Sequence, residues 1–432
     1  MSKSADKQDK KTLSQFASTK EIRDAMRDLY HRLQDVEDFR RSASVKYSLS
    51  LAFMLLIIGL MIGKNDPTNI ALFLNTPGIK IQIAKLLGYS GAIPSKQVFL
   101  RLLAQTPPSS FMTVIDEWMR EYFPPGNAHI ALDGKAVRAA LEKIMDQHHP
   151  PYNLGAVCVG TGMFIMQERV GKKTNETASL RGFAAKLELN NSYATIDAAG
   201  THSDIASIII SSNGHFALPT KDNQKHLRLA IEAAFMQPDE VTCSKIDIFD
   251  DDRSDVKAHG RYERRIARVL PVLPGTKLYR FIQASSFRDM VGAVGMIERY
   301  REVEKRNELG ERISEPTKQV VYYIMDEADM TAKKLNELVR AHWSIESCHY
   351  VMDMVFQEDA STIRTGYAME NMSLIRKIAH NLLRLFRKVF SKGTRCVSFQ
   401  HTRDRVLTDL GCLSGIFKPY SQRELRALKL KC

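Results

Sequence analysis

The stretch that decides the fold opens with "HIALDGKAVRAA" at residues 129–140. Its apolar first half predicts a short strand that ends at Asp133. The segment "LGAVCVGTGMFIMQERVG", residues 154–171, predicts a hairpin, because two apolar runs flank a Gly-Thr-Gly turn at residues 160–162. This part of the chain therefore begins with three predicted strands.

Two further strands follow, each after a predicted helix. A helix is expected at about residues 177–187, and the strand in "YATIDAAG", residues 193–200, ends at Asp197. A second helix around Ile205 precedes the strand "HFALPTK" at residues 215–221. The predicted elements thus follow in the order of the RNase H-like fold: three strands, a helix, a strand, a helix and a strand. In that fold, acidic residues at strand ends meet a carboxylate from a later helix. We therefore expect an α/β fold with a mixed sheet flanked by helices.

The chain is helical before this section and mixed after it. Three strand-like runs between residues 225 and 335, "CSKIDIFD", "KLYRFIQASSF" and "KQVVYYIMD", are more than one small sheet would hold, so they predict an insertion before the last catalytic helix. The expected organisation is a disordered polar lead-in at residues 1–20, an all-helical N-terminal domain at 21–125 and an RNase H-like catalytic domain at 126–390. The last of these would hold the insertion, at about 228–325, and a basic C-terminal tail would follow at 391–432.

The charge balance favours a polyanionic partner. The 432 residues include 62 Lys and Arg against 49 Asp and Glu, a formal net charge of +13. Such a field attracts nucleic acid first and an anionic membrane surface second, although a basic protein without such a partner remains an alternative. The six cysteines contain no Cys-x-x-Cys pair, which favours a reducing cytosol over a disulfide framework or a cysteine-zinc module.

One apolar segment raises the question of a membrane. Residues 47–63, "YSLSLAFMLLIIGLMIG", carry no charge for 17 residues between Lys46 and Lys64. A membrane span needs about 20 residues, so the segment is at the lower limit of length. We expect a fully buried core helix, with a peripheral membrane anchor as the alternative.

Asp133 and Asp197 are candidate metal ligands. Each follows an apolar strand, and carboxylates at adjacent strand ends point into one crevice. Two ionised carboxylates this close repel unless a cation neutralises them, and oxygen ligands select Mg²⁺ or Mn²⁺ over zinc. A single strand-end aspartate is more often a turn former. The acidic run "DIFDDDRSD" around Asp250 is interpreted instead as a solvated loop.

A third carboxylate is expected in "VRAHWSIESCHYVMDMVFQED", residues 339–359. On one helix, His342, Glu346, His349 and Asp353 fall at i, i+4, i+7 and i+11, which makes a continuous stripe. The spacing alone allows a zinc site, a purely structural stripe, or Glu346 as the third metal carboxylate. The HExxH spacing of zinc metalloproteases is absent, which disfavours zinc, and the two strand-end aspartates favour Glu346 as the third carboxylate.

Seven blocks recur in a fixed order along one known family. They are "IALDGKAVR", "KKTNETASL", "YATIDAAGTH", "ALPTKDNQ", "AHGRYERR", "HWSIESCHYVMDMVFQEDAS" and "RTGYAMENMSLIRKIAHNLLR". They resemble the DDE transposases of bacterial insertion sequences, and look most like the H-repeat-associated group. The front segment "VEDFRRSASVKYSLSLAFMLLIIGLMIG" is similar to the helical domain that precedes the catalytic domain in that group, and the resemblance covers about residues 33 to 383.

The resemblance implies site residues by position. Asp133, Asp197 and Glu346 match the metal triad of the family, which makes them the implied catalytic residues. The implied DNA-binding residues belong to a Lys-x-Asn-Gln and a His-Gly-Arg-x-Glu segment, and they are Lys221, Asn223, Gln224, His259 and Arg261.

Several positions depart from the family pattern. They are Asp222 for Gly, Ser347 for Asn, Tyr350 for Trp and Thr177 for Ile. His342 and Asp353 stand where related transposases have the Arg and Lys of a Tyr-Arg-Glu-Lys signature. None of these changes removes a metal ligand, so we expect only the handling of DNA ends to differ.

The implied activity is that of a transposase, with metal-dependent cleavage of phosphodiester bonds at insertion-sequence ends and strand transfer into target DNA. Two Mg²⁺ or Mn²⁺ ions would serve as cofactors, with Asp133 bridging them and Asp197 and Glu346 each holding one. The implied partner is double-stranded DNA, bound by a homodimer or larger assembly in the bacterial cytoplasm at the nucleoid. The alternative is a domesticated, catalytically silent relative that binds DNA without cutting it.

Overall fold

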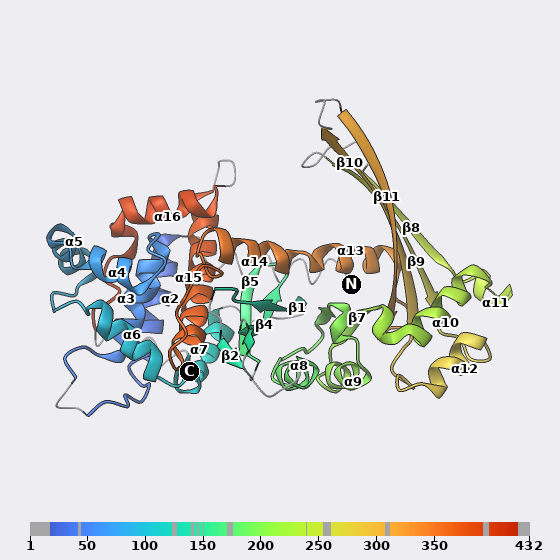
Figure 1. Cartoon of the computed structure of the whole chain (residues 1–432), viewed down its shortest axis with the longest axis horizontal. Coiled ribbons are helices and arrows are strands. Elements are labelled where there is room, and N and C mark those ends of the chain that lie inside the picture. Colours follow the sequence, from blue (N-terminus) through green and yellow to red (C-terminus); the bar gives the residue numbers. More distant parts are fainter. Residues whose placement is uncertain are drawn as a thin grey trace.

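The structure is a computed structural model, and it describes residues 18–41, 45–122, 128–139, 142–144, 147–149, 151–170, 176–238, 240–253, 261–306, 312–391 and 397–421. One nine-stranded sheet runs through the molecule (Figure 1). Its strands are β1 (His129–Ala136), β4 (Tyr152–Cys158), β5 (Met163–Arg169), β6 (Tyr193–Ile196), β7 (His215–Thr220), β8 (Asp247–Asp252), β9 (Arg261–Pro271), β10 (Ala293–Arg306) and β11 (Arg312–Met325). A separate small sheet pairs β2 (Glu142–Ile144) with β3 (Gln147–His149).

The strand order confirms the predicted fold class. It runs β5-β4-β1-β6-β7-β11-β10-β9-β8. Strand β1 is antiparallel to β4 and parallel to β6, and β6 is parallel to β7. An antiparallel group β5-β4-β1 that continues into the parallel pair β6-β7 is the RNase H-like arrangement, and the predicted hairpin at residues 154–171 forms β4 and β5.

The strands of the predicted insertion extend this same sheet beyond β7. Strand β11 pairs antiparallel with β7, and β10, β9 and β8 follow in antiparallel pairs. Strands β10 and β11 are 14 residues long each, and they project from the body of the molecule as an arm (Figure 1). The strand expected at "KLYRFIQASSF" is wrong. Helix α12 (Lys277–Ala284) forms there instead, because Leu278 and Ile282 bury one face at helical spacing and Thr276 caps the first turn.

The acidic run around Asp250 is a strand, so the expected loop is wrong. Within β8, Asp250 forms an ion pair with Arg264 of the neighbouring strand, and Asp251 lies 2.8 Å from Arg340. Successive side chains of a strand point to opposite faces, which brings these two carboxylates to different arginines. The Asp250 side chain is still 41% exposed.

Helices cover both faces of the sheet. One face packs against α8 (Glu176–Ala184), α9 (Ser203–Ser211), α10 (Lys225–Met236) and α12. The other face is covered by α13 (Ala332–His342), α14 (Ser344–Met354) and α15 (Ala368–Phe390). The short helix α11 (Glu240–Cys243) lies beyond α10 (Figure 1). The candidate site is therefore framed by the sheet and the α13–α14 pair.

The N-terminal helices share a core with the C-terminal ones. The helices are α2 (Thr19–Arg32), α3 (Leu49–Met61), α4 (Pro67–Leu74), α5 (Pro77–Gln82), the π-helix η2 (Ile83–Leu87), α6 (Lys96–Gln105), α7 (Pro108–Tyr122), α16 (Phe399–Thr408) and the 3₁₀ helix η5 (Leu410–Leu413). Together with α15 they surround one hydrophobic core (Figure 1). The boundaries of separate domains expected from the sequence remain a prediction.

The apolar helix α3 is a core helix, as predicted. All thirteen of its residues are buried. Among the described residues, no single helix is long and apolar enough to cross a membrane, although the pair Pro67–Leu74 and Pro77–Leu87, bent by 75°, reaches that length and composition jointly.

Helix α15 joins the helical core to the sheet through polar side chains. The amide group of Asn381 donates to the carbonyl of Phe164 at 2.7 Å and accepts from its N–H at 3.0 Å. Phe164 lies on β5, the edge strand, next to a register shift in the pairing of β4 with β5. Asn381 thus supplies the backbone partner that an edge strand lacks.

Replacing Asn381 with Leu should destabilise the fold. The change keeps the branched shape of the side chain but leaves the buried N–H and carbonyl of Phe164 without these partners, so the free energy of unfolding should fall by about 2–4 kcal/mol. Urea unfolding followed by the fluorescence of buried Trp118 measures this loss. The exposed control Gln97→Leu should shift stability by less than about 0.5 kcal/mol, and equal effects of the two changes would contradict the assignment.

A second prediction concerns acid stability. His380 is fully buried against Phe399, with ring centroids 5.0 Å apart, and burial lowers its pKa to about 3. The unfolded chain takes up this proton below a pKa of about 6.5, so stability should fall as the pH drops from 6.5 towards 3, by up to about 1.4 kcal/mol per pH unit. The stability advantage of His380→Phe over the parent should therefore grow between pH 7 and pH 4.5. Parallel pH curves for the two proteins would disprove the role of His380.

Candidate active site

The register of β1 and β6 places Asp133 and Asp197 side by side. Leu132 pairs with Ile196 in parallel, and the next residue of each segment is an aspartate. Neighbouring strands lie about 4.8 Å apart. The expected end of the strand at Asp133 is wrong, since β1 continues to Ala136. The reason is its second neighbour, because β4 keeps pairing with β1 as far as Tyr152 opposite Ala136.

Both aspartates are held by backbone groups. The N–H of Gly134 donates to Asp133 Oδ1 at 2.8 Å, and the N–H of Gly200 donates to Asp197 Oδ1 at 3.2 Å. The second interaction caps the 3₁₀ helix η3 (Ala198–Gly200). A side chain at Gly134 has no room, because its Cβ would lie 1.9 Å from the Tyr152 hydroxyl. Local backbone geometry therefore fixes each carboxylate.

The predicted stripe is carried by two consecutive helices rather than one. Helix α13 ends at His342, Trp343 is the junction, and α14 begins at Ser344. The two helices lie nearly end to end along the sheet (Figure 1). Of the stripe residues on α14, Glu346 is exposed, and His349 and Asp353 are half-buried.

Hydrogen bonds anchor the α13–α14 pair onto β1 and β6. Thr195 Oγ1 lies 2.8 Å from His342 Nδ1 and 2.7 Å from His129 Nε2. Burial lowers the pKa of His342 to about 4 and that of His129 to about 3, so both rings are neutral at pH 7. Further along α14, His349 Nδ1 lies 3.6 Å from Asp133 Oδ2. The two histidines of the stripe thus face different partners, which argues against a shared zinc ion.

The three predicted carboxylates line two adjoining hollows. Asp197 and Glu346 line a cleft of about 340 Å³, and Asp133 and Asp197 line a hollow of about 40 Å³. Asp197 belongs to both. Within the described part of the chain, no three His, Cys, Asp or Glu side chains are grouped closely enough to hold one metal ion. The carboxylates share a region without forming a compact ligand set, and their role as a triad remains a prediction.

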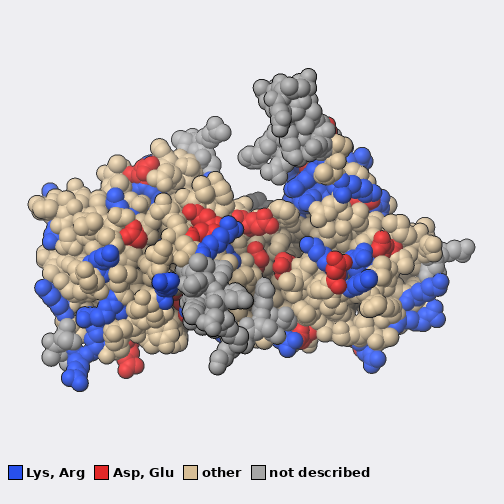
Figure 2. Space-filling model, viewed as in Figure 1, with Lys and Arg blue, Asp and Glu red and all other residues tan. Residues whose placement is uncertain are grey.

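Cationic and aromatic groups form the other side of the cleft. Lys221, Arg265 and Arg299 line it, and Arg265 is buried. The guanidinium of Arg299 lies 5.2 Å from the ring centre of the exposed Trp343. Figure 2 shows acidic residues gathered near the middle of this face, beside basic residues on the projecting arm. A polyanion in the cleft would meet cations on the arm side.

The predicted DNA-binding residues divide into three groups. Lys221 is exposed in the cleft. Asn223 donates to the carbonyl of Ala198 at 2.6 Å and Gln224 to that of Thr201 at 3.0 Å, so both hold the turn after Asp197. His259 lies outside the described residues, and of Arg261 only the backbone at the start of β9 is described.

A polar network beneath the site was missed from the sequence. Lys135 lies on β1 two residues after Asp133 and forms ion pairs with Asp353 and, at 3.0 Å, with the buried Glu358. Burial alone would raise the pKa of Glu358, but the nearby cationic side chains and a hydrogen bond from Ser373 lower it to about 2. The sequence did contain a signal for Lys135. It lies two residues after Asp133, and side chains at that spacing in a strand point to the same face of the sheet. Nothing in the sequence pointed to Glu358.

Two protein-family models match the chain. The family model described as Transposase DDE domain matches residues 124–382, which is more than half of the chain. A second family, described as DDE_Tnp_1-associated, matches residues 30–119. The boundary between the two matches falls just after α7.

Curated relatives carry similar names. The chain is 29% identical to "Putative transposase YncI" of Escherichia coli O157:H7 over 81% of this chain and 85% of the relative. It is 28% identical to "H repeat-associated putative transposase YhhI" of Escherichia coli strain K12, over 86% of this chain and 93% of the relative. The same figures of 28%, 86% and 93% hold for "Putative protein YbfL" of that strain.

Among solved structures, the chain is similar to a piggyBac transposase in a synaptic complex with hairpin DNA. The match has a TM-score of 0.41 and 11% identity, and it covers 94% of this chain and 82% of the other. The likeness is too remote to support a residue assignment. One of these relatives carries an H-repeat-associated name, which is consistent with the group expected from the sequence. On the extent of the family match, together with the strand order, the chain belongs to the DDE transposase family.

Proposed function

We propose that this transposase cuts phosphodiester bonds at the ends of an insertion sequence and joins those ends to target DNA, with Asp133, Asp197 and Glu346 as the catalytic carboxylates. One observation carries the proposal. Asp133, Asp197 and Glu346 come from β1, the turn after β6 and α14. Asp197 lines a hollow with each of the other two, and His349 of α14 lies 3.6 Å from Asp133. The match to the transposase family supports the same chemistry.

The donor set fits divalent ions such as Mg²⁺ or Mn²⁺. All three donors are carboxylates, which suit hard cations, and mutual repulsion keeps such groups apart until a cation neutralises them. Asp133 and Asp197 would hold the ions from the sheet and Glu346 from the helix. When bound, a pair of such ions stabilises the attacking and leaving oxygens of an in-line displacement at phosphorus.

The protein's own groups position the DNA strand and the helix. Lys221 is exposed in the cleft and can bind a phosphate oxygen, and Arg299 lies on the arm side of the same cleft. The hydrogen bonds of Thr195 hold His342, four residues before Glu346. We include His259 and Arg261 among the residues that contact DNA. Asn223 and Gln224 act at least by shaping the turn that carries Asp197.

The assembly proposed for this activity is at least a dimer. Transposition joins two ends of one element to a target, and each end requires a set of carboxylates. A helical part at residues 21–125 and a catalytic part at 126–390 would serve end binding and chemistry respectively, although α15 of the second part shares a hydrophobic core with the helices of the first.

Removing any one carboxylate should abolish cutting. Asp133→Ala, Asp197→Ala and Glu346→Ala should each lower Mg²⁺-dependent cleavage of DNA that carries the element's end by more than about 100-fold, since even indirect partners of metal ligands are worth 10–100-fold. Binding of the same DNA in EDTA should change little. Gel analysis of cleavage products and fluorescence anisotropy measure the two properties. Glu337→Gln on α13 is the matched control, because Glu337 is exposed and lies outside the cleft.

The outcomes separate the competing functions. Near-parental cleavage by the Glu346 variant would remove that residue from the site. A parent protein that binds the end DNA but never cuts it would instead support the catalytically silent relative.

Lys221→Gln should weaken DNA binding through a phosphate contact. Losing one such contact should make the slope of log K against log salt shallower by about 0.9. Anisotropy titrations over a salt series test this, with exposed Lys333→Gln on α13 as the control. A slope equal to that of the parent would exclude a phosphate contact by Lys221.

A further inference from the structure

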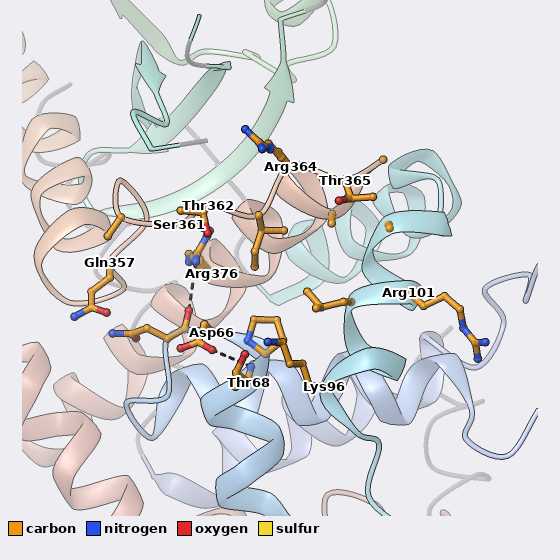
Figure 3. Close-up of a pocket in the computed structure, with 18 of the residues that line it drawn as sticks. Asp66, Thr68, Lys96, Arg101, Gln357, Ser361, Thr362, Arg364, Thr365 and Arg376 are labelled. Atoms are coloured by element: carbon orange, nitrogen blue, oxygen red, sulfur yellow. Dashed lines mark hydrogen bonds between the residues drawn. The ribbon is translucent and has the colours of Figure 1, made fainter. Parts of the chain in front are cut away.

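A large cleft lies away from the carboxylates, between the N-terminal helices and the segment that joins α14 to α15. It has a volume of about 870 Å³. Its walls come from the start of α4, one side of α6, and residues 357–366, with the first turns of α15 at its base (Figure 3). The cleft thus lies where the helical core meets the chain segment that leaves the catalytic helix α14.

The lining of this cleft is cationic and rich in donors. Lys96, Arg101, Arg364 and Arg376 contribute four positive charges, and Asp66 is the single carboxylate among the lining residues. The hydroxyl-bearing side chains that line it are Thr68, Ser361, Thr362 and Thr365. Arginine, lysine and hydroxyl groups are the side chains that most often contact phosphate. The composition therefore matches an anionic ligand.

Arg376 is an incompletely satisfied charge at the centre of the cleft. Its side chain is 2% exposed, and Figure 3 shows it between Thr362 and Asp66. Within the part of the chain that the structure describes, Arg376 donates one hydrogen bond, to the carbonyl of Asn65 at 3.3 Å, and its Nε is buried without a partner. A guanidinium carries five N–H donors. Burying a guanidinium that makes so few hydrogen bonds is costly unless a ligand supplies further acceptors.

The nearby carboxylates do not supply the missing hydrogen-bond acceptors of Arg376. Glu358 Oε2 accepts from Lys135 at 3.0 Å and its Oε1 accepts from Ser373 at 2.6 Å. Asp66 Oδ1 instead caps α4 by accepting from the N–H groups of Thr68 and Asn69. Both carboxylates are near enough to act on Arg376 through charge, yet both use their oxygens elsewhere.

The walls of the cleft are fixed by buried contacts. The N–H of Tyr367 donates to the carbonyl of Ala104 at 3.0 Å, which ties the loop to α6. Gly366 permits this approach, since its φ is +54° and a Cβ there would lie 2.3 Å from the same carbonyl oxygen. The buried Arg403 links the end of α3 to the end of α14 by donating to the carbonyls of Leu60 and Val355. A cleft held this way needs little ordering when it binds a ligand.

We propose that this cleft binds backbone phosphates of DNA, with Arg376 at its base and Lys96, Arg101 and Arg364 around it, as a contact separate from the carboxylate site. The proposal rests on the proposed function for its choice of DNA over other phosphate compounds. Two further observations favour a strand of DNA: the cleft is larger than one phosphate requires, and exposed cations border it. DNA held here would touch both the helical core and the segment leading from α14.

The test removes the exposed cations first. Lys96→Gln combined with Arg101→Gln should weaken binding of a fluorescein-labelled duplex from the element's end by about tenfold, and should make the salt slope shallower by about 1 to 2. The matched control is Lys80→Gln with Lys85→Gln, two exposed lysines of α5 and η2 outside the cleft. Its affinity should stay within about twofold of the parent. All titrations are done in EDTA, so the result stands whether or not the protein cuts DNA. Equal affinity and slope for the two double variants would overturn the proposal.

Arg376→Gln tests the base of the cleft. It should weaken duplex binding in the same assay, provided that its melting temperature shows a folded protein; if it does not fold, the Lys96 and Arg101 pair alone decides. A second measurement distinguishes DNA phosphates from a free phosphate compound. The melting temperature of the parent protein is compared in sodium phosphate and in sodium chloride of equal ionic strength. Stabilisation of the parent by inorganic phosphate, with no loss of duplex affinity in any cleft variant, would assign the cleft to a free phosphate compound instead. Tighter binding of an RNA duplex through the same residues would equally overturn the assignment to DNA.

Discussion

Leu132 of β1 faces Ile196 of β6 in a parallel register, and an aspartate follows each of them. Side chains alternate between the faces of a strand, so Asp133 shares a face with Ala131 and Asp197 continues that of Thr195. Ala131 belongs to the core beneath α14 and α15, and Thr195 contacts His342. The candidate site depends on this register. A shift of one residue in either strand would turn its aspartate to the opposite face of the sheet, away from Glu346.

The position of α14 depends on charges that the sheet supplies. Lys135 holds Asp353 near the end of α14 and Glu358 just beyond it, while Thr195 holds His342, the last residue of α13, two residues before α14 begins. Buried ion pairs contribute little net stability, because desolvation offsets most of their attraction. Their geometry is nevertheless specific, since leaving Lys135 or Glu358 without its partner in the interior is expensive. The network therefore acts mainly to fix where Glu346 lies relative to β1.

The sequence was sufficient for features that depend on local pattern and insufficient for those that depend on distant partners. The succession of strands and helices between residues 129 and 221 and the buried helix α3 follow from apolar runs and their spacing, and both were predicted. The extent of β1 was not predicted, because its continuation past Asp133 depends on pairing with β4.

Other features had no clear signal in the local sequence. The junction at Trp343 contains neither Gly nor Pro, so nothing in the local sequence marks a break between α13 and α14. Residues 277–284 carry an apolar pattern that fits a strand or a helix, and the Thr276 cap decides for the helix. Glu358 and Arg376 lacked any local signal, because their importance comes from burial.

Helix α15 connects these separate regions. Arg376 on one part of its surface lies at the base of the large cleft, Ser373 and Lys377 approach Glu358, and Asn381 binds edge strand β5. Burial lowers the pKa of Lys377 to about 8, while the charge of Glu358 opposes that shift. An anion bound at Arg376 would add negative charge beside the same Glu358 that pairs with Lys135. The helical core and the sheet that carries the candidate site are therefore joined by one buried helix whose charged residues face both, so an anion in the cleft would act on the same charges that position α14.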